Sequence, residues 1–476
     1  MRIPEKGLSR EEIVRTLEAY KAQDLPWQSG RVMAYVYDPG KEALDTAKQA
    51  YMMYLSESAL DPTTFPSVMR LEKEVVRMVI DLLRGDDQVV GNMTSGGTES
   101  ILLAMKTARD HARVTRPGIK APEMILARTA HPAFHKACAY FDIKPVVVDF
   151  DPESFRADVE AMRRAITENT IVIVGSAPGY AQGVVDPIPE IAALAQEHGL
   201  WCHVDACVGG IHLSFMRKLG YDVPPFDWTV PGVTSMSADM HKYGYAPKNA
   251  SIVMYREKAL RRHQIFSCLQ TTTYALINPT ILSTKSGAPM AGSWATLACL
   301  GEEGYFKIVR EVQDATARLV EGVNAIPGLR VLGKPDMCMF SFTSEEINLF
   351  QLAEEAKRRG WYVQPQFSTP ISPYNLHITM NQSSLSCVEA FLADLRAAVE
   401  AVRASDTQID IEAVRAQLNA LLEADPAGAR DQILALGGVS GTDLPDSMVM
   451  INCVLECLPD HVAEDLLAEY MNELFA

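Results

Sequence analysis

Helical and strand-like segments alternate between residues 65 and 255, and this alternation constrains the fold more than any other feature of the sequence. Short runs rich in β-branched residues are separated by stretches with apolar residues at helical spacing. Such strands pair in parallel through right-handed crossovers, so the segment predicts an open α/β sheet. Ligands of these sheets bind beyond the carboxyl ends of the strands. The strand-like runs are Glu123–Arg128, Lys144–Val148, Ile171–Val174, Leu200–Val204 and Ser251–Tyr255.

The pattern changes on either side of this segment and predicts four parts. Residues 1–60 are mostly helical and predict an N-terminal helical arm. Residues 61–315 form the predicted large domain. Shorter strand-like runs and two helices in residues 316–404 predict a small α+β domain, and residues 405–476 predict a C-terminal helical extension. A chain of 476 residues is long for one compact domain, which agrees with this division.

Charge and composition argue against several classes of partner. The formal net charge is −16 at pH 7, which disfavours binding to nucleic-acid phosphates and to anionic membranes. No apolar run approaches the roughly 18 to 20 residues that span a bilayer. The nine cysteines are scattered and lack the paired spacing of a zinc site, so we expect reduced thiols and a cytoplasmic location. The partner that we expect is a small molecule.

Two glycines precede a predicted helix in the stretch TSGGTES, residues 94–100. Gly96 and Gly97 let the backbone approach a ligand closely, and the free N–H groups at the start of a helix favour an anion such as a phosphate. The same stretch is also compatible with a plain helix start whose glycines only form a tight turn. The motif alone does not decide between these interpretations.

Two further motifs follow predicted strands directly. In HVDAC, residues 203–207, Asp205 comes just after an apolar run. A buried aspartate needs a cation or several donors, and the protonated pyridine nitrogen of pyridoxal phosphate is one such partner; a salt bridge or a helix cap is another. In TAHPAF, residues 129–134, the imidazole of His131 could stack on a planar cofactor or serve only as a structural hydrogen-bonding group.

The stretch SADMHKYGYAPK, residues 237–248, contains two lysines. A lysine that forms a Schiff base must lose its proton, and a crowded or cationic setting lowers its pKa. Lys242 lies next to His241 in a predicted loop ahead of a strand and suits this chemistry. The alternative interpretation is an ordinary surface lysine. Taken together, the glycine loop, histidine, aspartate and lysine describe one cofactor pocket.

These motifs resemble the sphingosine-1-phosphate lyases, which depend on pyridoxal phosphate and belong with related amino-acid decarboxylases to the type I aminotransferase fold. The resemblance implies a large domain with a mostly parallel sheet, a small α+β domain and a homodimer with shared active sites. It is carried by TSGGTESILLAMK, TAHPAFHKACAYF, GVVDPIPEIAALA, HVDACVGG and SADMHKYGYAPK.

The same resemblance implies a role for each matching residue. Lys242 would bind the cofactor covalently, Asp205 would pair with its pyridine nitrogen and His131 would stack on its ring. Lys248 would transfer protons near the reacting centre. Residues that would hold the cofactor phosphate are Gly97, Thr98, Ser237 and His241.

The substrate positions of that family differ in this sequence. Where the lyases carry an asparagine and a histidine that hold the substrate's phosphate, this chain has Ser58 and Asp61 in ESALDPTTFP, and it has Lys285 near a family arginine. At ~4 Å, two negative charges repel by about 4 kcal/mol at an effective dielectric of ~20. We therefore expect a carbon–carbon lyase whose amine substrate lacks the phosphate or carries an amine or hydroxyl there. The alternatives are an amino-acid decarboxylase and a catalytically idle binding protein.

Overall fold

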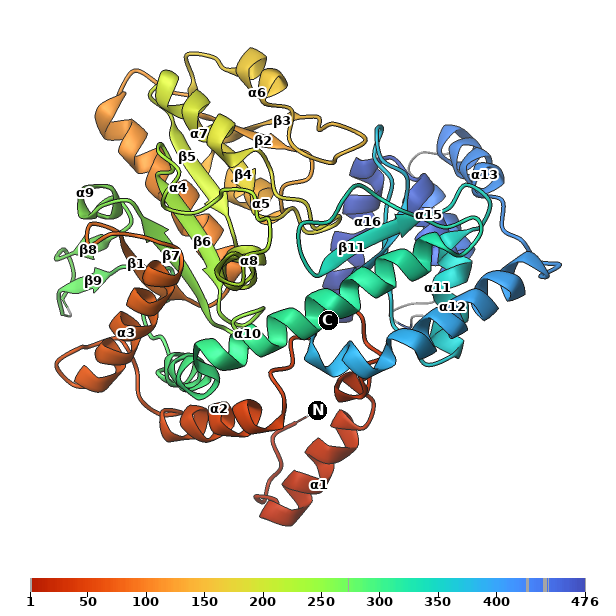
Figure 1. The fold of residues 1–476 in the computed structure, drawn as a ribbon, viewed down its shortest axis with the longest axis horizontal. Coiled ribbons are helices and arrows are strands. Elements are labelled where there is room, and N and C mark those ends of the chain that lie inside the picture. The colour runs from red at the N-terminus through yellow and green to blue at the C-terminus, as the bar shows by residue number, and fades with distance from the viewer. Residues whose placement is uncertain (1, 273, 425–427, 440–442, 444, 476) are drawn as a thin grey trace.

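The computed structural model describes every residue except 1, 273, 425–427, 440–442, 444 and 476. Its centre is a seven-stranded sheet whose strands β2 to β6 run parallel, while β7 pairs antiparallel with both β6 and β1. The predicted mostly parallel α/β sheet is therefore confirmed (Figure 1). In spatial order the strands are β1 Val90–Thr94, β7 Ser251–Tyr255, β6 Ser235–Asp239, β5 Trp201–Asp205, β4 Thr170–Ser176, β2 Glu123–Ala127 and β3 Lys144–Val148.

Two of these strands, β1 and β6, were absent from the sequence prediction. Their sequences, VGNMT and SMSAD, contain Gly, Asn or Asp, which are depleted in strands. They are strands because hydrogen-bonded neighbours lie beside them: β6 is fully buried between β5 and β7, and β1 pairs with β7. Pairing with these neighbouring strands cannot be recognised from the local sequence of β1 or β6.

Helices cover both faces of the sheet, and a separate apolar core lies on each face. One core is formed with α4 Gly97–Thr115 and α5 Ala133–Phe141. The other is formed with α3 Pro66–Leu82, α7 Ile188–Glu197 and α8 Gly209–Lys218. The remaining elements of this domain are α6 Val159–Ala165, α9 Lys258–Arg261 and the hairpin of β8 Phe266–Cys268 with β9 Leu276–Asn278.

The helix α10, Ala288–Asn324, joins the large and small domains and is kinked at Gly301, whose backbone is not helical. The domain boundary expected at residue 315 falls inside this helix. A four-stranded antiparallel sheet forms the small domain. Its elements are β10 Arg330–Val331, β11 Met339–Thr343, α11 Leu349–Arg358, β12 Gln364–Gln366, β13 Asn375–Thr379, the 3₁₀ helix η2 Gln382–Cys387 and α12 Val388–Arg403.

The N-terminal part contributes to the same molecule in two ways. The helix α1, Arg10–Lys21, buries none of its residues, whereas α2, Lys41–Met53, packs along α10. Between them, after the short 3₁₀ helix η1 Trp27–Ser29, the chain follows the small domain: Met33 N–H donates to the Tyr362 carbonyl at 2.9 Å. This contact brings residues 35–38 toward the centre of the molecule.

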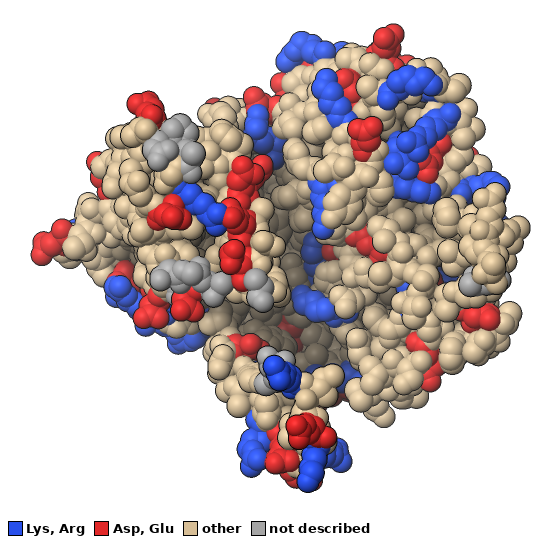
Figure 2. Space-filling model, turned by 180° about the vertical axis from the view of Figure 1, so that it is seen from behind, with Lys and Arg blue, Asp and Glu red and all other residues tan. Residues whose placement is uncertain are grey.

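The C-terminal extension has a small core of its own, which also includes Phe350 of α11. No helix among the described residues is long and apolar enough to cross a membrane. Seen from behind, a furrow separates the large domain from the small domain and extension, and Lys and Arg gather along its large-domain wall (Figure 2). The helices of the extension are α13 Ile411–Ala424, α14 Ala429–Leu436, α15 Val449–Cys457 and α16 Asp460–Leu474.

Candidate active site

One cavity of about 190 Å³ lies at the carboxyl ends of β4, β5 and β6. The structure brings six of the sequence-predicted residues into its wall from four separate stretches of the chain. These residues are Gly97, Thr98, His131, Asp205, His241 and Lys242. The other lining residues are Ile101, Ser176, Pro178, Tyr180, Cys207, Val208 and Asp239.

The amino end of α4 supplies an anion-binding corner of this cavity. No side chain caps the helix, so its first N–H groups remain available. A Cβ on Gly97 would lie 2.7 Å from Asp239 Oδ2 and 3.0 Å from Cys207 Sγ, so only glycine fits there without displacing its neighbours. Thr98 follows in the cavity wall. A phosphate group suits this corner.

Asp205 lies at the end of β5 with its two carboxylate oxygens in different surroundings. Oδ1 accepts hydrogen bonds from the Cys207 N–H at 3.1 Å and from the Ser237 hydroxyl at 3.2 Å. Oδ2 accepts none from the described residues, and Asp205 lines the cavity. Ser237 itself is fully buried, does not line the cavity and donates to Asp205. The carboxylate can therefore receive a proton-bearing ring nitrogen on Oδ2.

Lys242 forms an ion pair with a second carboxylate, Asp239, at 3.0 Å. Burial by itself would lower the pKa of Lys242, but the charge of Asp239, with a weaker contribution from Asp205, raises that pKa well above its usual value. The expectation that a crowded or cationic setting lowers this pKa is therefore wrong, because two carboxylates face the lysine. Asp239 itself is buried, and its Oδ1 has no hydrogen-bond partner among the described residues.

The two histidines of the site differ in their partners. His131 accepts a hydrogen bond at Nδ1 from the Ala133 N–H, so its Nε2 is free to carry a proton. His241 Nδ1 lies 2.7 Å from the Ala250 carbonyl and donates to it, while its Nε2 lies 3.7 Å from Asp239. Burial holds the pKa of His241 below its usual value. His241 is therefore neutral at pH 7, with Nε2 available as an acceptor.

Lys248 lies outside the cavity wall but close to it. Its ammonium sits 5.1 Å from the centre of the Tyr37 ring and donates to the Tyr35 carbonyl at 3.3 Å. Burial and the charge of Lys242 lower the pKa of Lys248. Burial raises the pKa of Tyr37 to about 12, and Lys242 and Asp239 act on that phenol with opposite signs. Lys248 thus contacts the ring of Tyr37, whose phenol is in turn close enough to Lys242 to feel its charge.

The three predicted substrate residues do not line this cavity. Asp61 accepts hydrogen bonds from the N–H and hydroxyl of Thr63 at 2.8 and 2.6 Å, on the loop before α3. Ser58 forms an isolated bridge with Ser286 on the same loop surface. Lys285 is buried and pairs with Glu72 at 3.2 Å, with a further bond to the Met93 carbonyl. Lys285 therefore holds the large domain together rather than facing the Lys242 cavity.

Three contributors to the site were missed from the sequence: Asp239, Tyr180 and Tyr37. Asp239 ends β6, as Asp205 ends β5, so strand ends were an available signal, but β6 itself was not recognised. Tyr180 follows β4 and hydrogen-bonds Gln364 of the small domain at 2.8 Å. Tyr37 belongs to the predicted N-terminal arm, and no local signal connects it with a loop two hundred residues away.

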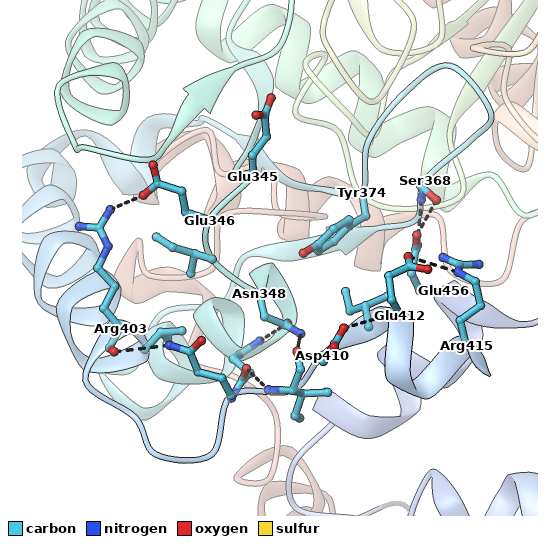
Figure 3. A pocket seen from close by; sticks show the side chains of 16 residues that line it. Glu345, Glu346, Asn348, Ser368, Tyr374, Arg403, Asp410, Glu412, Arg415 and Glu456 are labelled. Carbon is cyan, nitrogen blue, oxygen red and sulfur yellow. Dashed lines mark hydrogen bonds and ion pairs between the residues drawn. The ribbon is translucent and has the colours of Figure 1, made fainter. Parts of the chain in front are cut away.

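A larger cavity of about 620 Å³ lies between the small domain and the C-terminal extension (Figure 3). Two contacts hold its charged side chains: Arg403 pairs with Glu346, and Glu456 accepts from the Ser368 N–H at 2.9 Å. Figure 3 shows Arg403 paired with Glu346 within the small domain and Ser368 paired with Glu456 across the junction. No cluster among the described residues could hold a metal ion. The 620 Å³ cavity connects two parts of the molecule, whereas the Lys242 cavity carries the reactive groups.

The Lys242 cavity fits pyridoxal phosphate on its chemistry. An uncapped helix start could receive a phosphate, a free carboxylate oxygen could receive a ring N–H, and the Lys242 amine lines the same cavity. The residues are present in one wall, and glycine at position 97 leaves the space that a side chain would fill.

Comparisons with known proteins agree with this chemistry. A family model described as the pyridoxal-dependent decarboxylase conserved domain matches residues 36–344, and one described as a pyridoxal-dependent enzyme, C-terminal putative HTH domain, matches residues 416–473. The chain is 43% identical over 411 residues to sphingosine-1-phosphate lyase of Arabidopsis thaliana, which covers 85% of this chain and 74% of the relative. It is 35% identical over 361 residues to a probable L-aspartate decarboxylase of Pyrococcus furiosus, covering 76% of this chain and 94% of the relative.

Solved structures show the same fold. The sphingosine-1-phosphate lyase of Burkholderia pseudomallei superimposes with a TM-score of 0.81 at 35% identity, over 89% of this chain and 96% of that one. Glutamate decarboxylase of Lactobacillus brevis superimposes with a TM-score of 0.76 at 18% identity, over 86% of this chain and 96% of that one, and supports the fold alone.

Proposed function

Because this chain belongs to the pyridoxal-dependent decarboxylase family and is a pyridoxal-phosphate-dependent lyase similar to sphingosine-1-phosphate lyases, we propose that it cleaves a carbon–carbon bond in a hydroxylated amine that lacks a phosphate. The bond broken joins the carbon that bears the amine to the carbon that bears the hydroxyl. An aldehyde leaves, the hydroxyl gives up its proton, and the amine-bearing carbon gains one.

The observation that carries this proposal is a second lysine beside the reactive one. In this assignment Lys242 holds the cofactor, Asp205 Oδ2 accepts from its ring nitrogen, and Thr98 with the first N–H groups of α4 holds its phosphate. Bound there, pyridoxal phosphate supplies an electron sink for the bond that breaks. Lys248, whose pKa is lowered by burial and by Lys242, moves the proton.

The phosphate-free substrate is proposed from the charge of Asp61. Hydrogen bonds from Thr63, and weaker ones from Thr64, hold the pKa of the Asp61 carboxyl below its usual range, so it is ionised at neutral pH. A fixed negative charge opposes a phosphate and favours an amine or hydroxyl group. Asp61 does not line the Lys242 cavity of its own chain, so it can act on the substrate only in the cavity of another chain.

We further propose that the chain forms a homodimer in which Asp61 faces the partner's cavity. Two exposed apolar features support a partner. A groove of about 870 Å³ contains Asp61 together with Met69, Tyr274 and Ile277. On α1, the exposed apolar residues Ile13, Leu17 and Tyr20 lie three and four positions apart and share one helix face. A two-fold partner is the usual way for such a surface to be covered.

A substrate panel with product identification tests the reaction. We expect aldehyde and amine products from unphosphorylated hydroxy-amines and little turnover of sphingosine 1-phosphate. The double variant Ser58→Asn/Asp61→His restores the family's polar groups and should increase turnover of the phosphorylated substrate. Efficient turnover of sphingosine 1-phosphate by the wild type, with no gain in the variant, would refute the phosphate-free assignment.

The shared site has its own test. Light scattering after size-exclusion chromatography should give twice the chain mass of 52.4 kDa. Hybrid dimers of wild-type chains with Lys242→Ala/Ser58→Asn/Asp61→His chains then separate the two contributions. If Asp61 acts across the interface, the hybrid retains one intact cavity that faces the restored residues, and it turns over the phosphorylated substrate. A monomeric protein or an inactive hybrid would contradict the proposal.

A second candidate reaction is α-decarboxylation of an amino acid. The probable L-aspartate decarboxylase that is 35% identical to this chain favours it. The same panel separates the two reactions, because a decarboxylase releases carbon dioxide and an amine without an aldehyde. We expect no carbon dioxide release from amino acids.

We also propose that the C-terminal extension does not bind nucleic acid and that the protein is cytoplasmic. After residue 404 the chain contains fourteen Asp and Glu but only two Arg and no Lys, which opposes contact with phosphates although part of it matches a putative HTH model. All nine cysteines are free thiols, as a reducing compartment favours. Filter binding with duplex DNA and fractionation of cells test the two statements.

A further inference from the structure

A line of buried polar side chains runs from the interior of the sheet to Asp205. Trp201, His203 and Asp205 alternate along β5 and share one face, and Ser235 and Ser237 share that face of β6. The register pairs His203 with Ser235 and Asp205 with Ser237. Each of these five side chains is at most 7% exposed. Of the five, Asp205 and Ser237 had a predicted role, and the other three had none.

Hydrogen bonds connect the five side chains in sequence. Trp201 Nε1 donates to Ser235 Oγ at 2.7 Å, and Ser235 Oγ lies 2.8 Å from His203 Nδ1. His203 Nε2 lies 3.4 Å from Ser237 Oγ, which donates to Asp205 Oδ1 at 3.2 Å. The line therefore ends on the carboxylate oxygen that faces away from the proposed ring nitrogen.

The protons along this line have one arrangement that satisfies every group. An indole N–H only donates and a carboxylate only accepts, so both ends are fixed. Ser237 gives its proton to Asp205 and must accept from His203 Nε2, which leaves Nδ1 to accept from Ser235. With the proton on Nδ1 instead, the Ser235 hydrogen would have no acceptor among the described residues.

We propose that His203 is a positioning residue, held as the neutral Nε2–H tautomer, which orients a one-way series of donors onto Asp205 Oδ1 so that Oδ2 is presented, ionised, to the cofactor's ring nitrogen. Donors on a carboxylate lower its affinity for a proton. The shared proton then stays on the ring nitrogen, which keeps the ring an effective electron sink.

The surroundings of His203 maintain its neutral form. Burial lowers the pKa of His203 to about 4, although the nearby Asp205 carboxylate opposes this effect. From α5, the apolar Phe134 ring contacts the imidazole with centroids 5.8 Å apart. The β6 side of the imidazole offers only the two serine hydroxyls, which carry no charge. Protonation at Nδ1 would require Ser235 to reverse its hydrogen bond.

The tautomer can be observed without activity. In apoprotein labelled with ¹⁵N-histidine, long-range ¹H–¹⁵N spectra distinguish the two neutral tautomers from imidazolium, and a His203→Gln variant assigns the signal among the ten histidines. We expect the Nε2–H tautomer unchanged between pH 6 and pH 8. An Nδ1–H tautomer or an imidazolium at pH 6 would overturn the proposal.

Cofactor analogues test whether the series of donors acts on the ring nitrogen. His203→Phe keeps an aromatic ring but removes both hydrogen bonds, whereas His203→Gln keeps a donor and an acceptor. We expect His203→Phe to weaken pyridoxal phosphate binding by about tenfold or more, because Ser237 loses the donor that orients its own hydrogen bond onto the charged Asp205 carboxylate. His203→Gln should recover most of that loss. With the 1-deaza analogue, which lacks the ring nitrogen, wild type and His203→Phe should bind within about twofold of each other.

The control is His212→Phe, which replaces an equally buried histidine of α8. It should leave the ratio between the two cofactors unchanged. Should His203→Phe fail to fold, Ser235→Ala interrupts the line one step earlier with a smaller change of volume. Equal weakening of both cofactors in the His203 or Ser235 variants would mean that the residues only maintain packing, and it would refute the positioning role.

Discussion

Asp239 is expected to control the protonation of the reactive lysine, and the substitution Asp239→Asn tests this. The two side chains are 3.0 Å apart, with exposures of 1% and 18%. At that distance and an effective dielectric of about 20, opposite charges attract by about 5 to 6 kcal/mol, equivalent to about 4 pKa units. Asparagine retains a dipole and Asp205 remains nearby, so we expect the pKa of Lys242 to fall by at least about 2 units.

Competitive labelling of the apoprotein measures this shift. An amine-reactive reagent is applied across pH 6 to 11, and mass spectrometry quantifies the peptide containing Lys242 against the peptide containing the exposed Lys258. Wild-type Lys242 should label slowly until the pH exceeds its usual pKa of 10.5, because its pKa is raised. In Asp239→Asn the rise in labelling should begin at lower pH.

The same ion pair affects stability with a defined sign. Because the folded-state pKa of Lys242 is raised, its contribution to the free energy of unfolding is fully present below pH 10.5 and disappears as the pH rises through the folded value. Asp239→Asn should therefore lower stability at neutral pH and approach the wild type in strong alkali. Asp205→Asn is the matched control, with a smaller shift. Superimposed labelling curves for wild type and Asp239→Asn, or a larger shift in the control, would refute the reasoning.

Three further predictions concern the cofactor corner, proton transfer and acid stability. Gly97→Ala should weaken cofactor binding at least about tenfold in a fluorescence titration, since its Cβ would collide with Asp239, while Gly118→Ala, whose Cβ meets nothing within 4 Å, should bind normally. Lys248→Met should lower kcat about 100-fold without changing the cofactor's absorbance, as loss of a proton-transfer group predicts; an unchanged kcat would remove Lys248 from the mechanism. Below pH 6.5 histidines of the unfolded chain bind protons, whereas buried histidines of the folded chain stay neutral. The free energy of unfolding, measured with urea, should therefore fall by about 2 kcal/mol per buried histidine between pH 7 and pH 5. The histidines whose pKa burial lowers to about 4 are His203, His212 and His377.

Local sequence carried most of the chemistry of the site. Asp205 could be found because a run of apolar residues marks β5 and the residue at its end, and Gly97 because glycines precede an amphipathic helix. Lys242 of SADMHKYGYAPK was found from residue type and the order of motifs, whereas the role of His241 was implied by the resemblance to the lyases. These signals depend on neighbours along the chain, which is why they survive without a structure.

Tertiary structure decided how those groups behave. Asp239 ends a strand that exists because β5 and β7 pair with it, so neither β6 nor its carboxylate could be recognised locally. The charge on Lys242 depends on a distance of 3.0 Å through space, and electrostatic energy follows that distance rather than the sequence separation. Lys285 is similar: its buried pairing with Glu72 comes from packing of α3 against the loop before α10. Residue identity sets which chemical groups the protein has, whereas folding sets which charges meet, because burial and proximity are properties of the packed chain.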